Sequence, residues 1–163
     1  MRISDIRSMM LIGPDRHGIG GAARNWSIIV VRVDTDAGVY GLGEALNYMG
    51  VRDALAYIKR RLVGRDPLDV RPIVTDLIYG GLPPHTPAGC PNDVPHGPIV
   101  WAAGAVEMAL RDLAGKALGV PVYTLLGGKY RDQIAIYLDR SAPAHVDDLD
   151  AWRRLAVETR ERG

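Results

Sequence analysis

Two glycine-rich segments come nearest to a ligand-binding motif in this sequence of 163 residues. Residues 18–23 read GIGGAA and fit the dinucleotide fingerprint G-x-G-x-x-A. That fingerprint receives a pyrophosphate only where a helix begins directly after it, and the next predicted element here is a strand over residues 27–33. Gly128-Lys129 fails as a phosphate-binding loop, because Tyr123 and Tyr130 occupy the positions that need a glycine and a serine or threonine. We therefore expect no nucleotide site.

The histidines and aspartates do not follow a metal-ligand pattern either. No histidine has a second histidine, a cysteine or a carboxylate at a ligand spacing such as H-x-x-x-H; the four are His17, His85, His96 and His145. The aspartates gather at a predicted turn and at a predicted helix start, where carboxylates serve as caps; these are Asp34, Asp36, Asp147, Asp148 and Asp150. A Mg²⁺ site needs carboxylates that converge from separate elements. The sequence thus predicts no metal ligands in this chain.

Composition narrows the class of partner. Lys plus Arg total 20 against 19 Asp plus Glu, so no net charge favours nucleic acid or an anionic membrane. Cys90 is the single cysteine, which fits a reducing compartment. The longest apolar run near the start, residues 9–12, is too short for a signal peptide or a membrane span. These features favour a cytoplasmic protein with no nucleic-acid and no membrane partner.

The elements that would position any site begin with three predicted strands, over residues 3–12, 27–33 and 39–44. A turn signal at residues 35–38 joins the last two strands, which predicts an antiparallel meander. Helical spacing of apolar residues then predicts helices over residues 51–62, from Asp69 to about Tyr79, and from Pro98 to Gly119. On the last of these helices, Pro98 suits the first turn, and the predicted i,i+4 ion pairs are Glu107–Arg111 and Asp112–Lys116. Its expected apolar stripe comprises Ile99, Ala103, Val106, Leu110, Leu113 and Ala117. The proline-rich stretch 82–97 is expected to be irregular. The predicted fold class is α+β, with helices covering one face of a three-stranded sheet.

The last part of the chain has a different pattern. After the long helix come a short apolar turn, Gly127-Gly128, and a strand-like run over residues 133–138. Asp147 and Asp148 favour a helix start, and an apolar stripe is expected to be buried on that helix: Leu149, Trp152, Leu155, Ala156 and Thr159. A complete (β/α)8 barrel takes roughly 250 residues, so this part of the chain can supply only one of its βα units.

The run AxExALRDLAGKALGVPVYxLLGGxxRDxIxxY, within residues 103–137, closely resembles the join between the capping domain and the barrel in the mandelate racemase and muconate-lactonising branch of the enolase superfamily. The resemblance implies an N-terminal capping domain over residues 1–132 and the first βα unit of an incomplete barrel over residues 133–163. In such enzymes Mg²⁺ stabilises an enolate formed by removing the proton next to a carboxylate. The acidic ligands and catalytic lysines come from later barrel strands, so the chain is expected to hold no catalytic residue and to be inactive alone.

The resemblance also suggests where this chain meets substrate. Residues 41–44, GLGE, look like the GxGEA signature at the end of the third strand, where we favour close backbone packing for the glycines and amide hydrogen bonds for Glu44. Asn47 and Tyr48 follow in a short loop that, with the loop over residues 13–25, would close over substrate. Arg16 and His17 are then candidates to meet a carboxylate or hydroxyl, since an arginine fork fits a carboxylate. Ordinary solvated loop charges are the alternative for this pair.

The implied function is the substrate-specificity part of a Mg²⁺-dependent lyase or isomerase. An acid-sugar dehydratase acting on a small carboxylate is the first hypothesis, and a racemase or cycloisomerase is the second. The implied partners are the acid sugar, a barrel domain and further copies of the same chain in a homo-oligomer. A stand-alone capping module without catalytic function is the non-enzymatic alternative.

Overall fold

The computed structural model describes residues 1–13, 26–79, 97–135 and 147–161. Contacts divide the chain into two units, which are described separately here. The first comprises Met1–Leu11 and Ser27–Lys129, and the second comprises Ile12–Trp26 and Tyr130–Gly163. Within the described ranges, no helix is long and apolar enough to cross a membrane.

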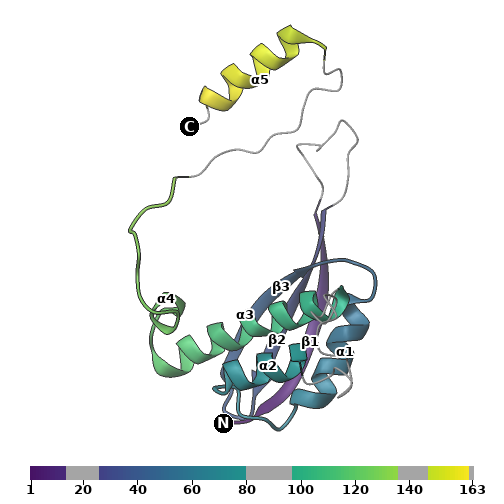
Figure 1. Cartoon of the computed structure of the whole chain (residues 1–163), viewed down its shortest axis with the longest axis vertical. Coiled ribbons are helices and arrows are strands. Elements are labelled where there is room, and N and C mark those ends of the chain that lie inside the picture. Colours follow the sequence, from purple (N-terminus) through teal and green to yellow (C-terminus); the bar gives the residue numbers. More distant parts are fainter. Residues whose placement is uncertain (14–25, 80–96, 136–146, 162–163) are drawn as a thin grey trace, which may run out of the picture. The chain divides into compact units, whose positions relative to one another are not determined.

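Three strands form one sheet in the order β1-β2-β3: β1 (Ile3–Gly13), β2 (Trp26–Thr35) and β3 (Tyr40–Leu46). β2 and β3 are antiparallel, with Val31 opposite Gly43 and Val33 opposite Gly41. The turn between them closes through Thr35, whose hydroxyl donates to the Val39 carbonyl at 2.6 Å. The predicted three-stranded antiparallel meander is therefore confirmed (Figure 1).

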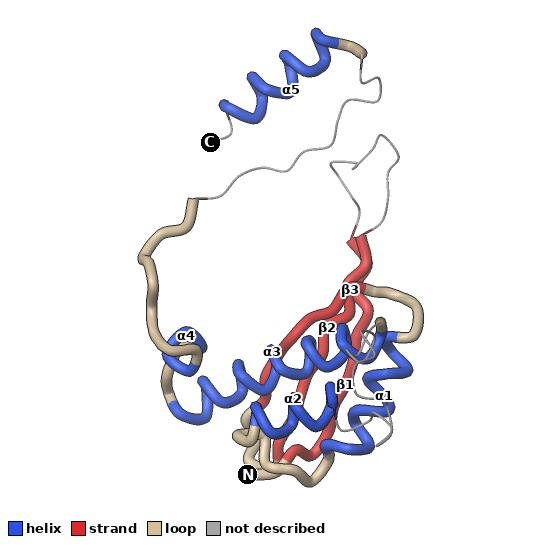
Figure 2. The backbone as a smooth tube through the Cα atoms, viewed as in Figure 1, coloured by secondary structure: helices blue, strands red, loops and turns tan. Residues whose placement is uncertain are grey.

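Helices cover one face of this sheet, as Figure 2 shows for α1 (Val51–Leu62), α2 (Val70–Tyr79) and α3 (Pro98–Leu118). The residues that β2 turns toward them alternate along the strand, as expected for a sheet with one buried face. The core joins these to apolar residues from each helix, and its fully buried members include Ile29, Val31, Val33, Ile58, Leu62, Ile73, Val106, Leu110 and Leu113. The predicted α+β architecture is thus observed.

The predicted ends and ion pairs of the long helix are also observed. Pro98 lies in the first turn of α3, and Gly119 closes the helix at φ 68°, with its N–H directed to the carbonyls of Gly115 and Lys116. Positive φ favours glycine at this capping position. The two expected i,i+4 pairs form at 2.6 Å and 2.5 Å, between Arg111 and Glu107 and between Lys116 and Asp112. Ala117 departs from the expected stripe and is exposed.

Gly41 and Gly43 let α3 lie directly against β3. A Cβ atom on Gly41 would sit 1.9 Å from the carbonyl oxygen of Ala109, and one on Gly43 would sit 2.0 Å from that of Ala105. No side chain fits at such distances. The interpretation of these strand glycines as close-packing residues is therefore confirmed.

The interpretation of Glu44, on the same strand, is wrong. We expected its carboxylate to accept hydrogen bonds from nearby amides, but among the described residues it has no hydrogen-bond partner and is exposed. The reason is the alternation of the strand: Gly43 and Ala45 face the helices, so Glu44 points to the opposite, uncovered face. Asp69 occupies the position just before α2, where its backbone carbonyl accepts from the Ile73 amide at 3.0 Å.

The second unit contains the helix α5 (Leu149–Glu161), which Asp148 caps by accepting from the Ala151 amide at 2.8 Å. The expected buried stripe on this helix is wrong for this chain, because no residue of α5 is buried. Residues 133–135 of the predicted strand carry no strand structure, and residues 136–138 lie outside the described ranges. A strand requires a neighbour to pair with, and none pairs with residues 133–135 in the described part of the chain.

Candidate functional site

The loop between β3 and α1 opens onto a surface depression of about 710 Å³. Its lining combines the loop, the first turns of α1 and one residue of β1: Ser8, Asn47, Tyr48, Met49, Gly50, Arg52, Asp53 and Ala56. Two of the four predicted substrate-contact residues, Asn47 and Tyr48, therefore lie side by side in one concave site. The other two, Arg16 and His17, fall outside the described residues.

Asn47 is held by the sheet. Its side-chain nitrogen donates to the Ser27 hydroxyl at 3.1 Å and to the sulfur of Met10 at 3.2 Å, which ties the loop to β2 and β1. Both amide hydrogens are thereby used within the protein. Among the described residues no donor contacts its side-chain oxygen, so this oxygen is the group that Asn47 offers to a ligand.

Tyr48 is held by its backbone and by an aromatic neighbour. Its amide donates to the Leu46 carbonyl at 2.9 Å, and its own carbonyl accepts from the Val51 amide at 3.2 Å. The ring meets Trp101 of α3 edge-on, with centroids 5.2 Å apart and planes at 63°. The side chain of Tyr48 is 55% exposed, and within the described ranges its hydroxyl has no hydrogen-bond partner. Tyr48 thus presents a fixed ring with an available phenol.

Gly50 makes the turn from this loop into α1. It adopts φ 84°, a conformation that side-chain-bearing residues rarely take. A Cβ at this position would come within 3.0 Å of Pro98 Cγ in the first turn of α3. The loop is therefore seated against the start of α3 at two points, Gly50 on Pro98 and Tyr48 on Trp101.

Arg52 and Asp53 place one positive and one negative charge on the rim. Both are exposed, and neither has an ion-pair partner among the described residues. A guanidinium with unused donors can bind a carboxylate through two parallel hydrogen bonds. The rim can therefore meet an anionic group on one side and hydroxyl groups on the other.

Sequence reasoning missed Ser8, Arg52 and Trp101. Arg52 and Ser8 carry no local signal, since each sits in a regular element whose other face is apolar. Trp101 did carry one: it interrupts the polar side of a predicted amphipathic helix with a large aromatic, and its side chain is 45% exposed. A half-exposed aromatic beside a predicted loop is a reason to look for a contact there.

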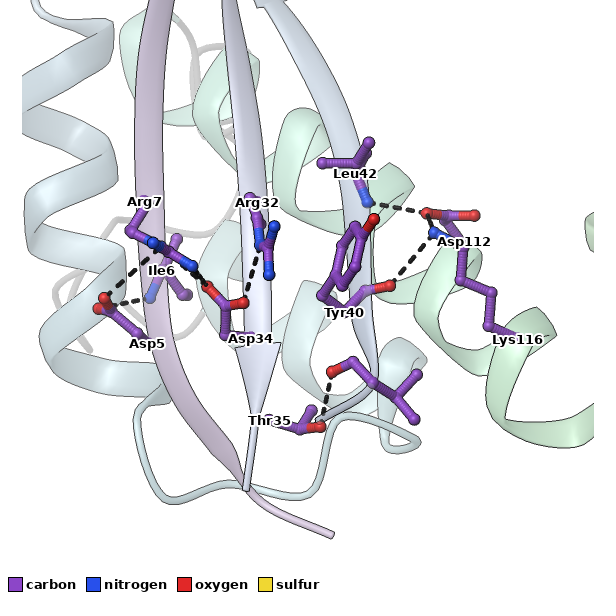
Figure 3. A network of polar contacts seen from close by, with 11 residues as sticks. Asp5, Ile6, Arg7, Arg32, Asp34, Thr35, Tyr40, Leu42, Asp112 and Lys116 are labelled. Carbon is purple, nitrogen blue, oxygen red and sulfur yellow. Dashed lines mark hydrogen bonds and ion pairs between the residues drawn. The ribbon is translucent and has the colours of Figure 1, made fainter. Parts of the chain in front are cut away.

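A second polar cluster lies on the uncovered face of the sheet (Figure 3). Asp34 accepts from Arg7 at 2.8 Å and from Arg32 at 2.8 Å, and the Arg32 guanidinium lies 3.8 Å from the centre of the Tyr40 ring. Burial disfavours the charged form of Asp34, but hydrogen bonds from Arg7 and Arg32 outweigh it and hold the pKa of this carboxyl below its ordinary value. Every charge in this cluster has a partner, so we interpret it as structural.

Asp5 is similarly engaged beside that cluster. A hydrogen bond from Lys59 lowers the pKa of the Asp5 carboxyl below its ordinary value, and the Ile6 amide at 2.8 Å adds to the effect. No group of three or more histidine, cysteine, aspartate or glutamate side chains in the described ranges is arranged to hold a metal ion. Neither the depression nor the uncovered face therefore offers a ligand set for Mg²⁺.

Comparison with known proteins links this domain to a family. The family model for the mandelate racemase / muconate lactonizing enzyme N-terminal domain matches residues 14–127. D-xylonate dehydratase of Haloferax volcanii is 37% identical over 146 residues, which cover 90% of this chain and 30% of that protein. D-mannonate dehydratase of Novosphingobium aromaticivorans is 33% identical over 116 residues, covering 68% of this chain and 26% of that protein.

Solved structures agree in fold. An enolase from Agrobacterium radiobacter, bound to sodium and L-malate, matches with a TM-score of 0.61 and 29% identity over 84% of this chain and 30% of its own. A mandelate racemase/muconate lactonizing enzyme from Sulfitobacter matches with a TM-score of 0.64 and 25% identity over 80% of this chain and 31% of its own. The chain spans about 30% of the length of these relatives.

Proposed function

Because the chain belongs to the mandelate racemase and muconate lactonizing enzyme family, as its N-terminal domain, we propose that it is the capping domain of a Mg²⁺-dependent acid-sugar dehydratase. The observation that carries this proposal is that several relatives are named as dehydratases of acid sugars, among them D-xylonate and D-mannonate dehydratases. Each shares the capping domain and extends well beyond it. The activity belongs to a complete protein in which this domain is joined to a barrel.

The residues present indicate which functions we assign to the capping domain and which to the barrel. We place the capping domain at residues 1–132 and the first βα unit of the barrel at residues 133–163, a division supported by the contacts that group Ser27–Lys129 with the sheet. When bound, Mg²⁺ supplies stabilisation of the negative charge that forms next to the carboxylate. Since the described residues hold no ligand set for it, we assign the ion and the catalytic base to the barrel, and expect the isolated chain to be inactive.

The chain's own contribution is binding and the exclusion of water. The free oxygen of Asn47 accepts a hydrogen bond from a sugar hydroxyl, and the phenol of Tyr48 donates one to a second oxygen of the substrate. We further propose that Arg16 and His17, in the loop over residues 13–25, contact the carboxylate or a hydroxyl. Closing these two loops over the substrate removes water from the reacting carbon, which strengthens every polar contact there.

Two other functions remain as alternatives. A racemase or cycloisomerase of the same family uses the same proton abstraction, and an isomerase from Streptomyces coelicolor is among the structural relatives, with a TM-score of 0.62 and 26% identity over 80% of this chain and 33% of its own. A capping module without catalytic function is the non-enzymatic alternative. We further propose a cytoplasmic homo-oligomer.

The decisive experiment supplies the complete protein with Mg²⁺ and a panel of acid sugars in D₂O. Dehydration breaks the C–H bond next to the carboxylate, expels the neighbouring hydroxyl as water and leaves a 2-keto-3-deoxy acid, which is detected as its semicarbazone. A racemase would instead exchange the α-proton for deuterium and return the intact acid. Formation of the keto acid supports the proposal. Exchange without loss of water, or no reaction across the panel, contradicts it.

The contact residues are tested in the same protein. Asn47→Ala, Tyr48→Phe, Arg16→Ala and His17→Ala should each lower kcat/KM, by an amount that differs between acid sugars, because a specificity contact discriminates between ligands. The free energy of unfolding should change by no more than about 0.5 kcal/mol for Tyr48→Phe, Arg16→Ala and His17→Ala, whereas Asn47→Ala should cost about 1 kcal/mol because it removes the bonds to Ser27 and Met10. Asp66→Asn, on a surface loop away from the depression, is the matched control. Equal kinetics for all four variants would refute these assignments.

A further inference from the structure

We infer that Trp101 is a positioning residue for Tyr48, so that the first turn of α3 sets the direction in which the substrate-facing phenol points. This inference rests on the proposed function of Tyr48 and adds a residue that lies outside the loop. Trp101 itself lines none of the depression. Its role is exerted through the ring of Tyr48.

The geometry supports a directional contact. The two ring centroids lie 5.2 Å apart at an interplanar angle of 63°, which is the edge-to-face arrangement that aromatic pairs prefer. Edge-to-face contact restricts both side-chain torsions of a tyrosine, because rotation about either one moves the ring edge off its partner. The phenol of Tyr48 is then held in one direction at the mouth of the depression.

The backbone on both sides of this contact is also fixed. Gly50 lies against Pro98, three residues before Trp101, and the carbonyl of Gly97 accepts from the Val100 amide at 3.1 Å and closes the first turn of α3. On the loop side, Asn47 is tied to Ser27 and Met10. The backbone that carries each ring is therefore held by contacts of its own, which favours keeping the two rings together.

Exposure of the pair argues against a purely structural role. Trp101 is 45% exposed and Tyr48 is 55% exposed, so neither ring is a member of the buried core. Core packing would have buried such large aromatic surfaces. The contact fixes the orientation of Tyr48, and a fixed orientation has a functional effect only if the Tyr48 side chain contacts a ligand.

The contact is tested first by NMR on the chain itself. The ring of Trp101 should shift the ring-proton resonances of Tyr48, and Trp101→Leu should move these resonances toward free-tyrosine positions, whereas Trp101→Phe should keep part of the shift. Met108→Ala is the matched control, since Met108 is also on α3 and is 46% exposed. Unchanged Tyr48 resonances in Trp101→Leu would overturn the inference whatever the enzyme does.

The consequence is tested by kinetics in the complete protein. Trp101→Leu should raise KM or lower kcat/KM for acid sugars roughly two- to tenfold, the range expected for losing one aromatic pair. The loss should disappear when Tyr48 is already alanine, and Trp101→Phe should restore most of the activity. Such non-additivity is the signature of one residue acting through another.

The outcomes separate the inference from the proposed function. If Tyr48→Ala impairs turnover but Trp101→Leu does not, the inference fails and the function of Tyr48 stands. If Trp101→Leu is equally harmful with and without Tyr48, Trp101 acts by another route and the inference fails. If neither variant changes turnover, both the inference and the role of Tyr48 are refuted.

Discussion

At the scale of single residues, the absence of a side chain is the main determinant of how this domain packs. Gly41 and Gly43 bring β3 so near to α3 that a methyl group would overlap the backbone carbonyls of Ala109 and Ala105. The helix contributes small residues to the same contact, Ala105 and Ala109, both fully buried. Backbone, which cannot repack as a side chain can, therefore forms much of this interface.

Gly41→Ala and Gly43→Ala should each destabilise the domain by about 1–3 kcal/mol or more, because overpacking must separate the helix from the strand. Urea denaturation of the chain measures this loss. Gly104→Ala is the matched control on the same helix, where an added Cβ meets nothing within 4 Å. This control should gain about 0.5–1 kcal/mol from better helix propensity. Equal stability of the Gly41 and Gly43 variants and wild type would contradict the close-packing interpretation.

Asp34 makes the stability of the domain depend on pH. Its folded pKa lies below the ordinary value of 3.8, so its contribution to stability is fully present above about pH 4 and is lost as the pH falls through the lower folded pKa. Asp34→Asn should cost about 1 kcal/mol near pH 7, and this difference from wild type should vanish in strong acid. Denaturation curves at several pH values measure it. A stability difference that stays constant from pH 7 into strong acid would contradict this role of Asp34.

At the scale of elements, α3 both covers the sheet and protects its edge. β3 is an edge strand, and exposed strand edges invite pairing with other chains. Asp112 accepts from the Leu42 amide at 2.8 Å, and Lys116 donates to the Tyr40 carbonyl at 3.2 Å, so two outward-facing backbone groups are occupied (Figure 3). The i,i+4 pair predicted from the sequence thus has a second function in the fold.

Asp112→Ala should expose the edge of β3. We expect a loss of about 1 kcal/mol, because the Leu42 amide loses its acceptor, together with faster hydrogen exchange at that amide. Glu107→Ala is the matched control, since Glu107 pairs with Arg111 on the same helix and contacts no strand backbone. It should cost no more than about 0.5 kcal/mol, the value of an exposed helical ion pair. Identical exchange rates at Leu42 in both variants would refute edge protection by Asp112.

The sequence predicted those elements whose causes are local. The strand over residues 27–33, rich in β-branched residues, and the helical periodicity of α1 and α3 are read from neighbouring residues, and the structure confirms them. The contact between Tyr48 and Trp101 was missed because it joins distant segments and depends on the path of α3. The strand at residues 133–138 was predicted from composition, which says nothing about whether a pairing neighbour exists.

At the scale of the whole molecule, the two units differ in how much of themselves they bury. Every core residue in the described part of the chain belongs to the first unit, and none belongs to α5. Large apolar side chains on that helix are exposed, with Leu149 at 70% and Val157 at 56%. Stability of the isolated chain therefore resides in the first unit.

Deleting residues 133–163 should leave the thermal midpoint nearly unchanged and reduce aggregation, because the described residues of this segment include exposed apolar side chains and no core residue. Differential scanning calorimetry and light scattering measure the two effects. Replacing Leu149 and Val157 with serine in the intact chain is the matched control for surface hydrophobicity alone. A fall of many degrees on deletion would show that the second unit contributes to the core.

Gly41 and Gly43 of β3 also set the spacing at which the strand and α3 pack together. From Gly43 to Gly41 the strand advances about 6.6 Å, and from Ala105 to Ala109 the helix advances about 6 Å, so one helical turn matches two strand residues. Continuing this match by two strand residues brings Ala45 to the level of Trp101, in the first turn of α3. Tyr48, in the loop that follows β3, contacts the same Trp101. β3 and α3 run antiparallel, and their close contacts recur once per helical turn.

A residue inserted into α3 between Ala105 and Ala109 would rotate everything before it by about 100° relative to the sheet, since the helix has 3.6 residues per turn. The core contacts after Ala109 would remain while Trp101 turned away from Tyr48. Length changes in this family should therefore be tolerated in the connections at either end of α3 and selected against within it. The spacing of Ala105 and Ala109 thereby determines the direction in which Trp101 points at the start of the helix.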